Sequence, residues 1–286
     1  MATTHRSPFS HQIGRIPIRH LSPVQPENRW PSTAFVGEVV PFAATVFREG
    51  HDLIGADLLL TAPDGTVERH PMAMRAAGTD RWHADVQVEQ PGDWSWSVEA
   101  YADDWATWHH AATVKIGAGV DVELMLIAGA QLLERAMADA GSSPAAAVLA
   151  EARAAMRKMT LTPSARLAVA SDARLVAALS EHRPTSLRTA SEQLVLRVER
   201  TRAAVGSWYE FFPRSEGAKQ KRDGSWQSGT FATAAKRLPA VAAMGFDVLY
   251  LPPIHPIGRV NRKGPNNTLT PGPHDPGSPW AIGSTE

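Results

Sequence analysis

Residues 245–258, GFDVLYLPPIHPIG, constrain the fold of this chain more than any other segment. A glycine suited to the end of a helix precedes the apolar run 248–251, and a proline-rich loop follows it. Before that glycine, residues 230–244 carry apolar side chains at helical spacing, and residues 209–215, YEFFPRS, have the pattern of an earlier strand leading into a loop. Together they predict a β-α-β unit with two parallel strands, the second buried on both faces.

The loop that follows the second strand is a candidate site wall. In a (β/α)₈ barrel, active-site side chains come from the loops at the carboxyl ends of the strands. His255 lies in this loop, where it either faces the site or packs against backbone groups. Arg214 follows the first strand, and we expect it to form an ion pair within the barrel.

Residues 15–118 alternate short segments rich in valine and aromatic residues with turn signals, a pattern typical of an antiparallel β-sandwich. Residues 56–61 predict a strand, and Pro63-Asp64-Gly65 predicts a turn. Apolar residues alternate over residues 82–88 and again over 94–100, which predicts a hairpin with one buried face.

Tryptophan is frequent, with nine residues in the chain. Trp82, Trp94 and Trp96 lie at the apolar positions of predicted strands, so we expect them in the core. Trp105 and Trp108 lie in a polar stretch and are expected to be exposed. There they would stack on sugar rings if the domain binds carbohydrate; the alternative is a domain that only supports the enzyme or its dimer partner.

Between residues 119 and 205 the composition shifts to alanine, leucine, arginine and glutamate, which predicts a helical bundle inserted after the sandwich. Capping residues predict where its helices begin and end. The expected starts are Asp121, Ser143-Pro144, Thr162-Pro163 and either Ser186 or Thr189, and the expected end is Gly141.

The composition argues against several classes of partner. Lys plus Arg and Asp plus Glu both total 29, so the chain lacks the basic field that holds nucleic acid or an anionic membrane. Cysteine is absent, and His109 and His110 adjoin no metal-ligating residue, so we expect no metal site. No apolar run is long enough to span a membrane, and the first 14 residues have the composition of a disordered tail without a signal-peptide core, which favours the cytoplasm.

The most specific motif is the loop at residues 261–267, NRKGPNN, followed by PWAIG at residues 279–283. Together with residues 208–215 and 245–258, it resembles the maltose-1-phosphate maltosyltransferases of the α-amylase superfamily, the GlgE type. Residues 208–215 and 245–258 fit many amylase-like enzymes, whereas residues 261–267 and 279–283 indicate this family.

The resemblance implies an enzyme that moves a maltosyl group from α-maltose 1-phosphate to the non-reducing end of an α-1,4-glucan, with retention, phosphate release and no cofactor. Lys263 would hold the donor's non-reducing glucose, and Ser278 and Trp280 would line the donor pocket. A solvated loop is the alternative for Lys263, and we interpret Asn266 and Asn267 as loop formers. The helical insert would contribute to a homodimer.

The resemblance also implies that residues 206–286 are only the start of the barrel, truncated at Glu286. The catalytic carboxylates of the family lie on later strands, so no catalytic residue is assigned, and neither Glu210 nor Asp247 is given that role. We therefore expect the chain alone to be inactive. Two alternatives stay open: another enzyme of the superfamily, such as a branching or trehalose-forming enzyme, and a non-catalytic glucan-binding or assembly module.

Overall fold

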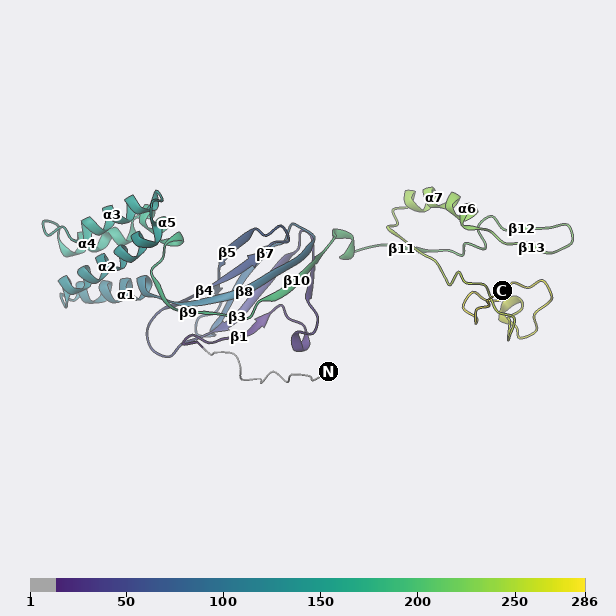
Figure 1. The fold of residues 1–286 in the computed structure, drawn as a ribbon, viewed down its shortest axis with the longest axis horizontal. Coiled ribbons are helices and arrows are strands. Elements are labelled where there is room, and N and C mark those ends of the chain that lie inside the picture. The colour runs from purple at the N-terminus through teal and green to yellow at the C-terminus, as the bar shows by residue number, and fades with distance from the viewer. Residues whose placement is uncertain (1–13, 286) are drawn as a thin grey trace. The chain divides into compact units, whose positions relative to one another are not determined.

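The computed structural model describes residues 14–285, which divide into two units at residues 199 and 200 (Figure 1). The disordered tail expected at residues 1–14 lies outside the described residues except for Gly14. Among residues 14–285, no helix combines the length and apolar character needed to cross a membrane.

The first unit contains two β-sheets and a group of helices. One sheet is antiparallel and runs in the order β1 (Ile18–Ser22), β3 (Val39–Val46), β7 (Arg81–Gln87), β6 (Ala73–Met74). The other runs in the order β2 (Ser32–Phe35), β10 (Leu194–Glu199), β8 (Gly92–Asp103), β4 (Ile54–Thr61), β5 (Val67–Pro71), with β9 (Thr185–Ala190) also on β8. It is mixed, because β10 pairs with β2 in parallel.

One apolar core joins the two sheets. Phe42 of β3 and Trp96 of β8 meet edge to face across it, with ring centroids 5.0 Å apart. Trp94 is also buried, and Trp82 is partly buried against the same core, which confirms the expected role of these three tryptophans.

The hairpin predicted over residues 82–100 is wrong. Its two strands, β7 and β8, belong to different sheets, and β7 pairs with β3 while β8 pairs with β4 and β10. The buried face predicted from the alternation is confirmed, since Ala84, Val86 and Val88 lie in the common core. Alternation shows which side chains face inward, but it does not identify the strand that pairs on either edge.

Five helices pack around a second core. They are α1 (Asp104–Gly117), α2 (Val122–Ala140), α3 (Ala145–Met156), α4 (Pro163–Ala168) and α5 (Ala173–Glu181), with the 3₁₀ turn η2 (Val169–Ser171) between the last two. Thr162 caps α4 by accepting from the Ala165 amide, and Gly141 follows the last residue of α2, as predicted.

Three of the helix predictions fail in part or in full. Helix α2 begins directly after Asp121, as predicted, but the Asp121 side chain makes no capping hydrogen bond, and its carboxylate instead lies 3.0 Å from the Lys115 ammonium. No cap is made by Ser143, because Pro144 occupies the N-cap position of α3. The helix expected from Ser186 or Thr189 is absent, since β9 and β10 occupy that stretch. Leu196 and Val198 of β10 are buried at a spacing of two, which is the spacing of a strand.

The expected exposure of Trp105 and Trp108 is also wrong, because both are buried in the helical core. The Asp103 carboxylate accepts from the Ala106 amide and starts α1, so the two rings lie on the inner face of that helix. The Trp108 indole donates to the Met125 carbonyl at 2.7 Å, and Gly129 leaves room for the ring.

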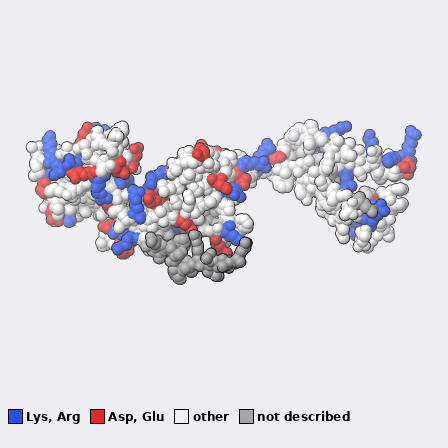
Figure 2. All heavy atoms as spheres, in the orientation of Figure 1, with Lys and Arg blue, Asp and Glu red and all other residues white. Residues whose placement is uncertain are grey.

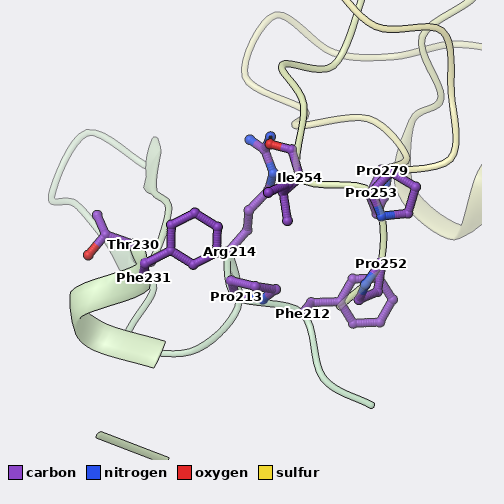
Figure 3. A pocket seen from close by; sticks show the side chains of 10 residues that line it. Phe212, Pro213, Arg214, Thr230, Phe231, Pro252, Pro253, Ile254 and Pro279 are labelled. Carbon is purple, nitrogen blue, oxygen red and sulfur yellow. Dashed lines mark hydrogen bonds between the residues drawn. The ribbon is translucent and has the colours of Figure 1, made fainter. Parts of the chain in front are cut away.

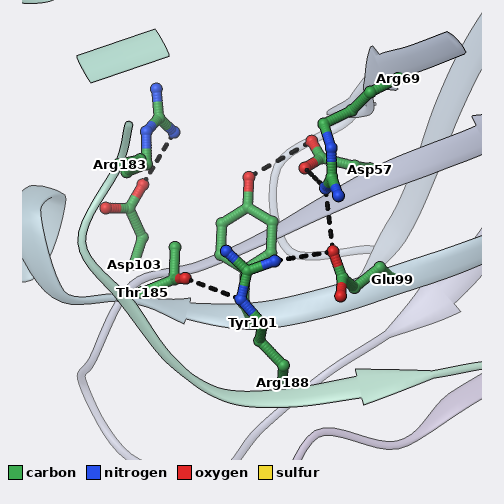
Figure 4. A network of polar contacts seen from close by, with 8 residues as sticks. All are labelled: Asp57, Arg69, Glu99, Tyr101, Asp103, Arg183, Thr185 and Arg188. Atoms are coloured by element: carbon green, nitrogen blue, oxygen red, sulfur yellow. Dashed lines mark hydrogen bonds and ion pairs between the residues drawn. The ribbon is translucent and has the colours of Figure 1, made fainter. Parts of the chain in front are cut away.

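Ion pairs lie where the helices meet the mixed sheet (Figure 4). Arg183, which follows α5, donates to Asp103 at the end of β8 at 2.9 Å. Within the sheet, Glu99 of β8 accepts from Arg69 of β5 and from Arg188 of β9, each at 2.9 Å. The Arg183–Asp103 pair therefore joins the point where the chain enters the helices to the point where it leaves them.

The second unit is built around one parallel pair of strands, β11 (Trp208–Glu210) and β14 (Val248–Tyr250). The crossover between them contains a small hairpin, β12 (Lys219–Gln220) with β13 (Trp226–Gln227), and the helices α6 (Phe231–Ala234) and α7 (Leu238–Ala243), which flank the 3₁₀ turn η4 (Ala235–Arg237). Two further 3₁₀ turns are η3 (Thr201–Ala203) and η5 (Pro265–Asn267).

The predicted β-α-β unit is therefore present. Thr230 begins its helix with a capping box, and Gly245 ends it with a φ of +85°. Pro239 lies in the first turn of α7, where its missing N–H explains the break in the expected single helix. The predicted burial of the second strand is wrong, because Val248 and Leu249 are only half-buried and Tyr250 is exposed.

Figure 2 shows acidic and basic side chains interspersed over the visible face of residues 14–199. This distribution agrees with the balanced composition of the chain and gives no extended basic surface on that face.

Candidate functional site

A cleft of about 220 Å³ lies at the carboxyl ends of both parallel strands (Figure 3). Its walls are mainly apolar and come from four segments: the loop after β11, the start of α6, the loop after β14, and the segment near residue 279. The lining residues are Phe212, Pro213, Arg214, Gly229, Thr230, Phe231, Pro252, Pro253, Ile254 and Pro279.

Arg214 connects the two loops that follow the strands. Its guanidinium donates to the carbonyl of His255 at 2.8 Å and more weakly to that of Ile254 at 3.4 Å. The ion pair expected for Arg214 is not formed among residues 14–285, and backbone carbonyls take its place. The arginine is thus the cationic side chain of the cleft lining, held by the wall that it faces.

The last segment of the chain returns to the loop after β14. The Gly258 amide donates to the Ile282 carbonyl at 2.7 Å, and the Ser284 amide donates to the Pro256 carbonyl at 2.9 Å. A β-carbon on Gly258 would lie 2.6 Å from the Ile282 oxygen, so the close approach of the two chains requires glycine there. This pairing brings Pro279 to the cleft.

Ser278 and Trp280 flank Pro279, so two of the three predicted sugar-binding residues lie at the edge of the cleft. The Trp280 ring meets the Phe212 ring edge to face, with centroids 5.4 Å apart, and remains 59% exposed. The Ser278 hydroxyl accepts from the Trp280 amide at 3.3 Å. An exposed ring braced at its edge is free to stack against an apolar face of a ligand.

Lys263 does not line this cleft. It is half-buried in the loop at residues 261–267, and its ammonium has no hydrogen-bond or ion-pair partner among residues 14–285. Asn266 and Asn267 have positive φ angles of 51° and 62°, which agrees with their interpretation as loop formers.

Arg262 is a residue that sequence reasoning missed. Its guanidinium donates to the carbonyls of Ile257 at 2.7 Å and Gly258 at 3.1 Å, and so attaches the Lys263 loop to the loop after β14. The motif NRKG gave no sign of which of its two cations is held by the backbone. Only the folded geometry separates an anchored arginine from a free lysine.

His255 is exposed, and its Nδ1 lies 3.1 Å from the Pro256 carbonyl. It does not line the cleft, although its backbone carbonyl holds Arg214. His255 therefore contributes to the cleft through its backbone carbonyl and not through its ring.

Acidic side chains are absent from the residues that line the cleft. Asp247 accepts from the Ser207 amide at 3.2 Å, which places it at the opposite end of β14, and Glu210 is exposed on β11. Within residues 14–285, no group of three or more His, Cys, Asp or Glu side chains is placed to hold a metal ion. With apolar walls and one guanidinium, the cleft is suited to binding rather than to proton transfer.

Comparison with known proteins places these features in a family. The family model described as "Alpha-1,4-glucan:maltose-1-phosphate maltosyltransferase, domain N/S" matches residues 14–200. The chain is 49% identical over 275 residues to maltosyltransferase 2 of this name from Streptomyces coelicolor, covering 96% of the chain and 40% of that relative.

Two further relatives carry the same enzyme name. Maltosyltransferase 1 of S. coelicolor is 48% identical, and the match covers 100% of the chain and 42% of that relative. The Mycobacterium tuberculosis protein is 39% identical, and the match covers 96% of the chain and 42% of that relative. The chain thus spans about two fifths of the length of the curated relatives that it matches.

Proposed function

The chain belongs to the α-1,4-glucan:maltose-1-phosphate maltosyltransferase family, and from this premise we propose that it forms part of an enzyme with that activity. The whole enzyme would move a maltosyl group from α-maltose 1-phosphate to the non-reducing end of an α-1,4-glucan, with retention of configuration and release of phosphate. Identity near one half over nearly the whole chain is the observation that carries this proposal.

The three parts of the chain would then have separate roles. The two sheets of the first unit would form a β-sandwich, the helices would contribute to a homodimer, and β11 to β14 would begin the (β/α)₈ barrel. The parallel pair with its crossover helices supports the last of these assignments. The cleft at the carboxyl ends of both strands lies where a barrel holds its substrate.

We assign this part of the chain a binding role rather than a catalytic one. A retaining transfer uses two carboxyl groups about 5 Å apart, one as nucleophile and one as acid and base. The cleft supplies no carboxyl group, but its aromatic and proline walls suit the apolar faces of a sugar ring. Trp280 and Ser278 would border the donor, and Lys263 would donate to a donor hydroxyl.

Phosphate release tests this division of roles. The 286-residue chain and a longer protein containing it would be incubated with α-maltose 1-phosphate and maltohexaose. We expect release of phosphate from the longer protein only. Turnover by the 286-residue chain within tenfold of the longer protein would show that its own residues carry the chemistry.

The role of Lys263 is tested in the longer protein. Lys263→Ala should lower kcat/KM for α-maltose 1-phosphate by about ten- to a hundredfold, because a hydrogen bond from a charged group contributes about 1.5–3 kcal/mol. Lys219→Ala is the matched control, since Lys219 is exposed on β12. An unchanged kcat/KM for Lys263→Ala would leave this residue as a solvated loop lysine.

A further inference from the structure

Trp30 differs from every other tryptophan of the first unit. It is 68% exposed, whereas Trp82 is partly buried and Trp94, Trp96, Trp105 and Trp108 are at most 9% exposed. The residue precedes β2 and has Pro31 between it and the strand. The Arg29 guanidinium carbon lies 5.9 Å from the centroid of this ring, yet most of the indole remains in water. A large ring that stays so exposed beside a sheet is available to a ligand.

Trp30 lines a cleft of about 480 Å³ on the mixed sheet. Leu194, the first residue of β10, also lines this cleft, because β10 pairs in parallel with β2 directly after Trp30 and Pro31. Val24 and Val195 add partly exposed apolar surface. The cleft is well separated in sequence from the cleft of the second unit and shares no lining residue with it.

The polar lining of this cleft is balanced in charge. Arg29, Arg197, Asp93 and Glu192 all line the cleft, and Arg197 holds Asp93 through two hydrogen bonds of 2.8 and 3.1 Å. Because each sign occurs equally, the cleft has no net charge to attract an ionic ligand.

Side-chain amides complete the lining. The Asn28 amide donates to Glu192 at 3.2 Å, and the Gln193 amide donates to Ser95 at 2.9 Å, which fixes both groups and leaves their oxygens to accept. Fixed amides, an exposed indole and paired charges match a neutral ligand that has hydroxyls at its edge and C–H groups on its face. A pyranose chain has this chemistry.

We propose that the Trp30 cleft is a second oligosaccharide site, which binds the α-1,4-glucan outside the barrel with a glucose ring stacked on the indole. The choice of an α-1,4-linked glucan rests on the proposed function, whereas the site itself rests on the exposed ring and the neutral polar lining. Binding here would retain a long acceptor chain on the protein between successive transfers.

Calorimetric titration of the 286-residue chain with maltoheptaose tests the proposal, with cellohexaose as the β-linked comparison. We expect Trp30→Ala to weaken maltoheptaose binding by about tenfold or more, and Trp30→Phe to retain most of it, because stacking needs a ring. Asn28→Ala should weaken binding by a smaller factor. Trp226→Ala, which removes an exposed ring from β13 of the second unit, is the matched control and should leave binding at Trp30 unchanged.

Each outcome is decisive. Absence of maltoheptaose binding or equal binding of cellohexaose would overturn the proposal. Loss of binding in Trp280→Ala but not in Trp30→Ala would also overturn it, because the oligosaccharide would then bind at the cleft of the second unit. A melting transition like that of the parent chain would show that Trp30→Ala is folded, and Asn28→Ala provides an independent test if it is not. No phosphate release is needed, so failure of the transferase assay would leave a positive binding result standing.

Discussion

The two units differ in how much of their apolar surface they bury. Residues 14–199 enclose two cores, one between the sheets and one among the helices. In residues 200–285 the buried apolar side chains other than proline are Phe211, Ala234, Val241 and Ile257, while many larger ones remain exposed. Two short strands and a broken helix form too few layers to enclose a core. Apolar composition is therefore not sufficient, and the number of packed layers decides what is buried.

The units differ in charge as well. Residues 1–199 carry 18 Lys and Arg against 23 Asp and Glu, whereas residues 200–286 carry 11 against 6. The neutral total thus conceals an acidic and a basic region. Near the basic region's cleft, Arg214 and Arg262 donate to backbone carbonyls and remain without carboxylate partners among the described residues. The positive charge of these two arginines is therefore not neutralised by a neighbouring side chain among residues 14–285.

Hydrogen exchange should show the largest difference between the units. We expect the amides of Trp94, Trp96 and Val98 in β8 to exchange on the order of 10³-fold more slowly than those of Val248 and Tyr250 in β14. Core amides exchange only through global unfolding, whereas an exposed two-stranded pair opens locally. Equal protection of both strands in a verified monomer would contradict this comparison.

A matched pair of leucine substitutions should give the next largest effect. Leu58 is fully buried between the sheets, and Leu269 is 78% exposed in the second unit. Leu58→Ala should lower the free energy of unfolding of the first unit by about 2–5 kcal/mol, while Leu269→Ala should change it by less than about 0.5 kcal/mol. Urea denaturation followed by circular dichroism measures both. A similar cost at the two positions would show that exposure in this structure does not report packing.

The smallest effect concerns the pH dependence of stability. Burial, together with the nearby Asp57 charge, raises the pKa of Tyr101 to about 12 from a usual 10.0. The folded state therefore keeps the phenol protonated where the unfolded state loses its proton. This stabilisation is complete below pH 10 and is lost as the pH rises toward 12.

Tyr101→Phe should make the decline in stability above pH 10 shallower, as measured by urea midpoints at pH 9, 10 and 11. Tyr250→Phe is the control, because Tyr250 belongs to the second unit and should leave unfolding of the first unit unaffected. Identical slopes for Tyr101→Phe and the parent chain would show that the phenol titrates alike in both states.

Local signals were enough to predict several elements. The strand at residues 56–61 and the turn at Gly65 follow from β alternation and from a glycine with positive φ. The β-α-β unit was recognisable because Thr230 and Gly245 mark the ends of its helix in sequence. The family, too, was accessible from the loop at residues 261–267 and its neighbours. Each of these depends on residues close together in the chain.

Tertiary structure decided the features that depend on distant partners. β7 and β8 have the alternation of a hairpin, but pairing with β3 and β4 places them in separate sheets. Trp108 is buried because Gly129 admits its ring, whereas Trp30 stays 68% exposed with only the Arg29 guanidinium recorded over its ring among residues 14–285. A sequence records which side chains are apolar. Whether such a side chain becomes core or binding surface depends on which distant segment packs against it, and the free energy of that contact arises only in the folded chain.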